Sequence, residues 1–208
     1  MLDVAKISDA LLLAEADRRI NLKRWTADPL AFGRDVLPHH FRLPTSAGWH
    51  AEALRLLTQS VAPLKLAMHA PRGHAKSTLA SLLVPLLATV LNRKHFLLLI
   101  SNTHAQAVKF LQAIKYEWET NVALRAAAPQ VTPNKDKWSD SDIELFRDGR
   151  LCHKLLALGS GHQLRGLKFL QWRPDLVVID DGEDDEMVRS DLRRLAYQEW
   201  FDNVVLKV

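Results

Sequence analysis

A short stretch of the chain combines the residue types that grip a phosphate group. Residues 70–78 read Ala-Pro-Arg-Gly-His-Ala-Lys-Ser-Thr, with an apolar run on each side. In the strand–loop–helix pattern G-x-x-x-x-G-K-[ST], backbone N–H groups surround a triphosphate while a Lys and a hydroxyl contact it. Lys76 and Ser77 fit this pattern, whereas Ala70 and Ala75 stand at its two glycine positions. Taken alone, the stretch is also compatible with an ordinary helix N-terminus that begins with a Lys-Ser pair.

The loop pattern identifies the residues that we expect to contact the phosphates of a nucleotide. They are Arg72, Gly73, His74, Ala75, Lys76, Ser77 and Thr78. Lys76 would reach the β- and γ-phosphates of ATP, and the Ser77 hydroxyl would bind Mg²⁺. Arg72 lies inside the loop, where a cation can stabilise the transferring phosphoryl group.

Two carboxylates follow a short apolar strand farther along the chain. Leu176–Ile179 is followed at once by Asp180 and Asp181. An Asp at the end of such a strand holds Mg²⁺ together with the loop hydroxyl, so Asp180 and Ser77 are the predicted metal ligands. A second carboxylate nearby orients and deprotonates the attacking water. We expect Asp181 to have this role, and Glu183 is the alternative.

A glycine-punctuated loop ahead of this strand presents a second Arg. Residues 159–166 read Gly-Ser-Gly-His-Gln-Leu-Arg-Gly. Arg165 is therefore another candidate for the cation that acts on the phosphoryl oxygens, in its own subunit or in a neighbouring one. The pattern does not decide between Arg72 and Arg165, and a surface Arg without a catalytic role is equally compatible with it.

Hydrophobic periodicity predicts the elements that position these residues. The expected strands are 64–68, 95–100, 143–147, 151–158, 176–179 and 204–208, and the expected helices are 76–91, 105–121 and 190–203. Pro85 predicts a kink or an early stop in the first of these helices. Asp148-Gly149 predicts a hairpin turn, and 126–142 reads as a loop.

The N-terminal part reads as helical. Residues 1–30 and 31–37 predict two helices separated at Asp28-Pro29, and 49–60 predicts another. Phe41, Trp49 and His50 are rings that could stack on adenine, and ordinary packing in the core is the alternative for each.

The order of elements indicates an α/β fold of the P-loop NTPase type, in its ASCE branch. We expect a mostly parallel sheet flanked by helices, a helical N-terminal lead-in at 1–60 and a β-hairpin insertion. The ATPase core would occupy 61–208 and would be incomplete at its C-terminus, because a strand beginning at 204 is cut short.

Composition and charge indicate which kinds of molecule the protein could bind and in which compartment it could fold. The net charge is +4, but 180–191 holds seven acidic residues, so the rest carries 27 basic against 17 acidic residues. A basic body with one acidic cluster suits a polyanionic partner and a metal or phosphate site at the cluster, and a solvated surface of mixed charge is the alternative. Cys152 is the single cysteine, which excludes an internal disulfide and suits a reducing compartment. Cys and His show no zinc-site spacing, and the apolar pieces of 79–100 are too short to span a membrane, so we expect a soluble cytoplasmic protein.

Four motifs together resemble the ATPase domain of tailed-phage terminase large subunits. They are His69 to Ser77, Leu98 to Thr103, Leu164-Arg165-Gly166 and Arg173 to Asp181, and the resemblance covers roughly 30–208. In that family the loop carries an Arg, and a small residue replaces the Gly before Lys. The first and the last of these motifs resemble the Walker A and Walker B elements of P-loop ATPases.

This resemblance implies ATP hydrolysis that drives translocation of double-stranded viral DNA into a procapsid. It also implies Mg²⁺, a portal protein and a small terminase subunit as partners, a homo-oligomeric ring on the portal and the cytoplasm of a bacterial host. Arg165 resembles the Arg offered to a neighbouring subunit. The family's nuclease domain has no counterpart in these residues, so DNA cleavage is not expected. Another helicase-like, nucleic-acid-stimulated ATPase and an inactive nucleotide-binding prophage fragment are the alternatives.

Overall fold

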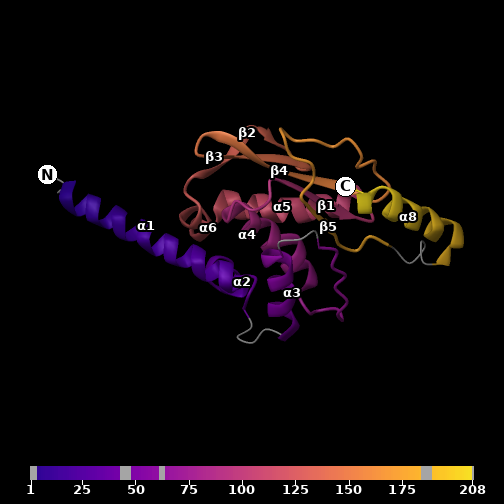
Figure 1. Ribbon diagram of the computed structural model, residues 1–208, viewed down its shortest axis with the longest axis horizontal. Coiled ribbons are helices and arrows are strands. Elements are labelled where there is room, and N and C mark those ends of the chain that lie inside the picture. Colours follow the sequence, from indigo (N-terminus) through magenta and orange to yellow (C-terminus); the bar gives the residue numbers. More distant parts are fainter. Residues whose placement is uncertain (1–3, 43–47, 61–63, 184–188, 208) are drawn as a thin grey trace. The chain divides into compact units, whose positions relative to one another are not determined.

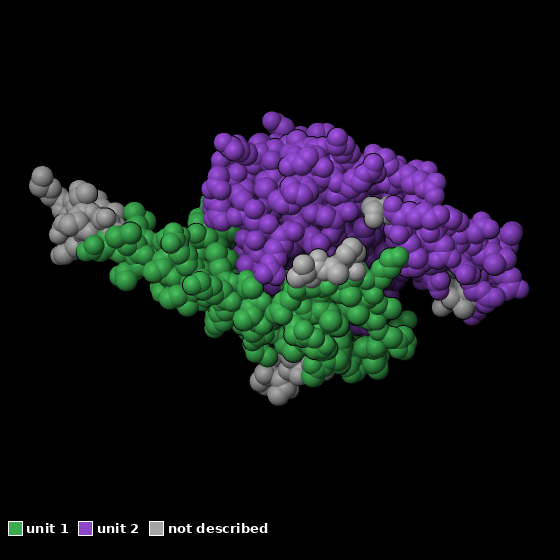
Figure 2. Space-filling view, in the orientation of Figure 1, with its two compact units in different colours: residues 1–75, 121–129 green, residues 76–120, 130–208 purple. Residues whose placement is uncertain are grey.

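The structure is a computed structural model, and it describes residues 4–42, 48–60, 64–183 and 189–207. The chain divides into two compact units, which Figure 2 shows in different colours. One unit comprises 1–75 and 121–129, and the other comprises 76–120 and 130–208. Each unit is described by itself.

The first unit is helical (Figure 1). It contains α1 (Val4–Ala27), α2 (Pro29–Val36), α3 (Gly48–Gln59) and α6 (Val122–Ala127). Asp28 separates the first two helices, because its side chain accepts a hydrogen bond from the Leu30 amide at 3.1 Å and Pro29 takes the first helical position. The predicted helices on both sides of Asp28-Pro29 are therefore confirmed, as is the helix predicted for 49–60.

A five-stranded sheet forms the centre of the second unit, in the order β2-β3-β4-β1-β5. The strands are β1 (Phe96–Ser101), β2 (Val131–Trp138), β3 (Asp142–Arg147), β4 (Arg150–Gly159) and β5 (Leu176–Ile179). β1 pairs in parallel with β4 and β5, and β3 pairs antiparallel with β2 and β4.

The fold is therefore α/β, as expected, but the sheet is mixed and the expectation of a mostly parallel sheet is wrong. The predicted hairpin is present, with Asp148 and Gly149 at φ 51° and 73° in its turn. It is not an insertion beside the sheet, however, because its second strand, β4, forms the parallel ladder with β1. The hairpin thus supplies a central strand of the sheet.

Helices cover the sheet of the second unit. They are η1 (Thr78–Leu83, a π-helix), α4 (Val84–Val90), α5 (His104–Thr120), α8 (Asp191–Asn203) and the 3₁₀ turn η2 (Val205–Lys207). α5 contacts β1 and β4. Phe96, Leu98 and Ile100 alternate along β1 and so share one face, where they pack with Trp200 of α8.

Three predicted segments differ in the structure. Residues 64–68 form no strand and Leu64 is 42% exposed, because a strand requires a ladder and no described residue pairs with this stretch. Of the strand predicted for 204–208, residue 204 forms a turn after α8 and 205–207 form η2, and Val208 lies outside the described residues. The loop expected at 126–142 contains β2, whose polar, exposed pattern is that of a sheet edge and carries no apolar alternation.

Pro85 changes the type of helix rather than ending it. It lies in the first turn of α4, directly after the π-helix η1. A proline has no N–H to donate to the carbonyl four residues earlier, so a change of hydrogen-bond pattern ahead of it is expected. Among the helices that the structure describes, none is long and apolar enough to cross a membrane.

Candidate active site at the carboxyl edge of the sheet

The parallel strands end together at one edge of the sheet. Ser101 at the end of β1 is paired with Gly159 of β4, and Ile100 is paired with Ile179 of β5. The Asp180 amide donates to the Ile100 carbonyl at 2.9 Å, which continues the ladder one step beyond β5. In open α/β sheets, ligands bind outside the carboxyl ends of the strands, at the point where the strand order reverses. Here the carboxyl ends of β4, β1 and β5 form this edge, and β5 lies on the side of β1 opposite to the other strands.

Backbone contacts fix the loops that follow these strands. The Asp181 carbonyl accepts hydrogen bonds from the Asn102 amide at 2.9 Å and from Ser101 Oγ at 3.3 Å. On the other side of β1, the Ser160 amide donates to the Ser101 carbonyl at 2.8 Å, and Ser160 Oγ donates to the Asn102 carbonyl at 3.0 Å. The polar residues at this edge therefore have defined positions.

Gly159 allows α5 to begin close to the sheet. A Cβ atom at this position would lie 2.9 Å from the His104 backbone nitrogen, a clash with main chain that cannot rotate away. We expect Gly159→Ala to lower the free energy of unfolding by about 1–3 kcal/mol, because the strand or the helix must shift. Chemical denaturation measures this. Gly161→Ala is the control for the steric clash, because a Cβ atom at that position meets nothing within 4 Å. Its φ of 80° means that this variant loses stability only through backbone strain. An unchanged stability for Gly159→Ala would contradict the close approach.

Asp180 contacts the helix that follows the Lys76-Ser77-Thr78 stretch. Ser81 Oγ donates a hydrogen bond to Asp180 Oδ2 at 2.8 Å, and Ser81 is buried within η1. Ser77 lies four positions earlier, and residues at this spacing are neighbours on one face of a helix. Ser77 and Asp180 were predicted to bind the same Mg²⁺ ion. The hydrogen bond from Ser81 does not test that prediction, and Ser77 lies one helical turn before Ser81.

Asp181 and Glu183 are both exposed next to Asp180. Asp181 has a φ of 50°, a left-handed conformation that Asp and Asn adopt more readily than most residues. Gly182 packs on α8, since a Cβ there would lie 2.3 Å from the Tyr197 hydroxyl. Burial, with the negative charge of Glu183 as a lesser cause, raises the pKa of Tyr197. The two candidate bases, Asp181 and Glu183, are therefore close in sequence to Asp180, the candidate metal ligand. Neither of their side chains is buried.

The phosphate-loop residues 70–75 belong to the first unit, and Lys76 begins the second. Gly73 and Ala75 have φ values of 82° and 57°. The left-handed conformation explains why the general motif has Gly before Lys, and Ala75 adopts it at a cost of about 1 kcal/mol. His50 Nε2 lies 2.9 Å from the His74 carbonyl, so α3 supports the loop.

This contact gives His50 a role that the sequence did not suggest. We named His50 with Phe41 and Trp49 as rings that could stack on adenine. In the structure the His50 ring contacts the loop backbone and lies edge-to-face against Trp49, with ring centroids 4.3 Å apart. Phe41 and Trp49 are half-buried.

The two candidate Arg residues are both exposed. Arg72 lies in the first unit, where its carbonyl is 3.2 Å from His74 Nδ1. Arg165 donates from its guanidinium to the Asn203 carbonyl at 2.5 Å, at the end of α8. A cation is favourable at a helix C-terminus, where the last carbonyls lack partners. In this conformation Arg165 therefore stabilises α8 and does not reach Asp180.

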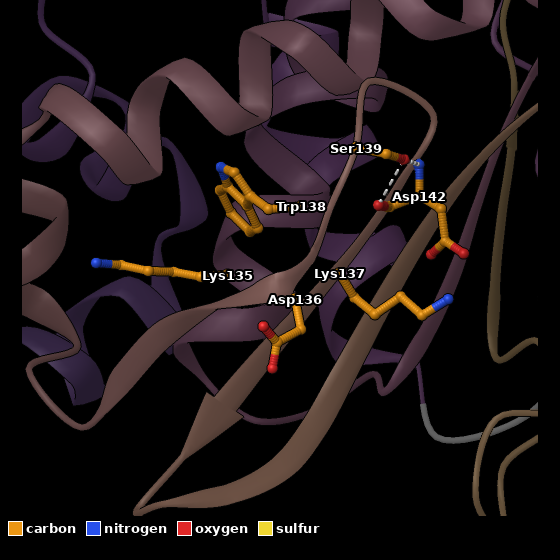
Figure 3. Close-up of a pocket in the computed structure, with 6 residues that line it drawn as sticks. All are labelled: Lys135, Asp136, Lys137, Trp138, Ser139 and Asp142. Atoms are coloured by element: carbon orange, nitrogen blue, oxygen red, sulfur yellow. Dashed lines mark hydrogen bonds between the residues drawn. The ribbon is translucent and has the colours of Figure 1, made fainter.

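A pocket of about 390 Å³ lies elsewhere, on the β2–β3 hairpin (Figure 3). It is lined by Lys135, Asp136, Lys137, Trp138, Ser139 and Asp142. β2 is the edge strand opposite β5, so this pocket is separated from Asp180 by the width of the sheet. None of the predicted site residues lines it.

Comparisons of the chain with protein-family models, with curated proteins and with solved structures gave no match. The proposed function therefore depends on the candidate site residues and their geometry in this structure.

Proposed function

We propose that this protein is an ATPase of the P-loop type that drives the translocation of double-stranded DNA, as the ATPase part of a viral packaging motor. The observation that supports this most is the hydrogen bond from Ser81 to Asp180. It joins the helix that begins at the Lys-Ser-Thr stretch to the carboxylate that follows a parallel strand. P-loop ATPases use a Ser or Thr at the start of such a helix and a carboxylate at the end of such a strand to hold Mg²⁺, and the contact between the two elements supports this proposal.

The donor atoms at this edge fit Mg²⁺, which prefers carboxylate and hydroxyl oxygens and keeps several of its waters. Asp180 offers a carboxylate oxygen beyond the one that Ser81 contacts, and in the described part of the chain nothing hydrogen-bonds that second oxygen. Asp180 and Ser77 would hold the ion. When bound, Mg²⁺ neutralises charge on the phosphates of the nucleotide.

The other steps of ATP binding and hydrolysis are assigned to residues of the chain. Residues Arg72 to Thr78 bind the phosphates, with the Lys76 ammonium directed to the transferring group. Asp181 orients the attacking water and accepts its proton, and Glu183 is the alternative base. Arg72 or Arg165 supplies the cation opposite the phosphoryl oxygens. For Arg165 this requires release of its contact with Asn203.

Double-stranded DNA is the proposed track because of charge and resemblance. Outside 180–191 the chain carries 27 basic and 17 acidic residues, which favours a polyanionic partner. The terminase-like motifs add the portal protein, the small subunit, a homo-oligomeric ring and the host cytoplasm to the proposal. A helicase-like ATPase would share the same site chemistry.

Steady-state ATP hydrolysis by the purified chain, with Mg²⁺ and with or without linear duplex DNA, tests the proposal. We expect Mg²⁺-dependent turnover that rises when duplex DNA is added and that falls again at high salt, because phosphate contacts are screened. Stimulation by single strands alone would indicate the helicase-like alternative. Nucleotide binding without turnover at high protein concentration would indicate the inactive fragment.

A further inference from the structure

Two His and the only Cys of the chain meet at the other end of the parallel strands. His95 directly precedes β1, and Cys152 and His153 lie near the start of β4. The register pairs Phe96 with Lys154, and the Lys154 amide donates to the His95 carbonyl at 2.8 Å, so His95 lies beside His153. This cluster is at the amino end of β1, whereas Asp180 is at the carboxyl edge.

A β-bulge explains how neighbouring residues of one strand can join the same cluster. In the β3–β4 ladder Leu145 pairs with His153 and Phe146 pairs with Leu151, which leaves Cys152 as the extra residue. Successive side chains of a regular strand point to opposite faces, and a bulge relaxes this alternation and redirects a side chain. One potential ligand atom from each of His95, Cys152 and His153 lies within 4.8 Å of the others.

The spacing of the sulfur and nitrogen atoms is that of a zinc site. Cys152 Sγ and His95 Nδ1 are 3.6 Å apart. Tetrahedral Zn²⁺ with Zn–S of about 2.3 Å and Zn–N of about 2.0–2.1 Å places such a pair about 3.5 Å apart. The pair therefore has the separation that a shared Zn²⁺ ion requires. His95 Nδ1 also lies 3.2 Å from the Cys152 carbonyl, so ion binding needs the tautomer in which this nitrogen carries no proton.

His153 provides an independent sign that a ligand belongs here. Its side chain is fully buried, Nδ1 lies 2.9 Å from the Lys94 carbonyl, and in the described part of the chain Nε2 has no partner. A metal-ligating His commonly donates its other N–H to a backbone carbonyl, as this one can to Lys94.

The surroundings hold the first ligand in place. The ring of His95 is stacked on Trp172 with centroids 4.0 Å apart and on His153 with centroids 5.4 Å apart. The Asp175 carboxylate accepts hydrogen bonds from the amides of His95 and Phe96, at 2.8 Å and 2.9 Å. Side chain and backbone of His95 are thus both fixed before any ion binds, which lowers the entropic cost of binding.

We propose that His95, Cys152 and His153 bind Zn²⁺, in a site separate from the ATPase site. Binding replaces the thiol proton, which leaves to solvent, by the ion. The Cys152 thiol donates a hydrogen bond to Asn92 Oδ1 at 3.4 Å, which loss of the thiol proton would end, and water would supply a fourth ligand. His95 and Cys152 are half-buried, so the ion can enter from solvent. The ion would join β1 to β4.

Titration of the purified full chain with Co²⁺ alone tests this proposal, because thiolate ligation gives a sulfur-to-cobalt charge-transfer absorption that nitrogen and oxygen ligands do not give. We expect this absorption to saturate at one equivalent and to be displaced by Zn²⁺ but not by excess Mg²⁺, which prefers oxygen ligands. Cys152→Ser should remove it. His95→Gln should weaken Co²⁺ binding by at least about 10-fold, since even outer-shell partners of a metal contribute that much.

His104→Gln is the matched control, since His104 is exposed at the start of α5, beyond the opposite end of β1. It should leave the titration unchanged. Circular dichroism of each variant shows that it is folded. The proposal is overturned if the folded wild type shows no charge-transfer absorption, or if the absorption changes in His104→Gln and not in His95→Gln.

Discussion

Lys76→Ala is expected to abolish ATP hydrolysis and to weaken ATP binding. The ammonium group of Lys76 is the compact positive charge that the loop pattern directs at the β- and γ-phosphates. The methyl side chain of Ala carries no charge and cannot contact the phosphates in this way. Removal of a single preorganised donor to a developing negative charge costs about 100-fold to 1,000-fold in rate. We therefore expect kcat/KM to fall by at least about 100-fold. Steady-state hydrolysis and calorimetric ATP titration measure the two effects.

Lys109→Ala is the control for loss of a positive charge in the same unit. Lys109 is exposed on α5, and its removal should leave both ATP binding and hydrolysis unchanged. Hydrolysis at the wild-type rate in Lys76→Ala would overturn the phosphate-loop assignment. In that case 70–78 would be an ordinary turn before a helix.

Asp181→Asn is expected to preserve ATP binding and to lower kcat by about 100-fold to 10,000-fold, the usual contribution of a general base. The substitution is well suited to the site. Asn tolerates the φ of 50° at this position at least as well as Asp, and the carbonyl that accepts from Asn102 and Ser101 is kept. A loss of activity would thus come from the carboxylate and not from a displaced loop. Single-turnover hydrolysis with prebound ATP separates the chemical step from binding.

Glu183→Gln provides the comparison for Asp181→Asn. Glu183 is exposed two residues farther along, and its longer side chain could reach a water that Asp181 does not. We expect Glu183→Gln to retain most of the hydrolysis rate. The opposite pair of results, with normal turnover in Asp181→Asn and none in Glu183→Gln, would transfer the role of base to Glu183.

Features that depend on a few consecutive residues could be predicted from the sequence. The Asp28-Pro29 pair separates two helices because the side chain and the imide act on neighbouring backbone only. Asp148-Gly149 forms a hairpin turn because both residues accept positive φ. The buried run of β1 and the strand that directly precedes Asp180 follow from uninterrupted apolar residues. Each of these signals is local.

Features that depend on pairing could not be predicted in this way. β2 is polar and was read as a loop, and it is a strand only because β3 lies beside it. Residues 64–68 have a strand-like apolar pattern, yet no described residue pairs with them. β propensity describes fit to a neighbouring strand more than an intrinsic backbone preference, so a single stretch does not decide it.

The sequence by itself identified the residues that we propose for the chemistry: a Lys-Ser pair that opens a helix, and two carboxylates that follow an apolar strand. Only the tertiary structure decided which atoms meet. Ser81, and not Ser77, is the residue whose hydroxyl contacts Asp180, because the helical turn sets which side chain faces β5. His95 approaches Cys152 and His153 because β1 and β4 are paired in register and a bulge redirects Cys152. Residue types are local information, whereas contacts between distant residues follow from strand register and helix packing.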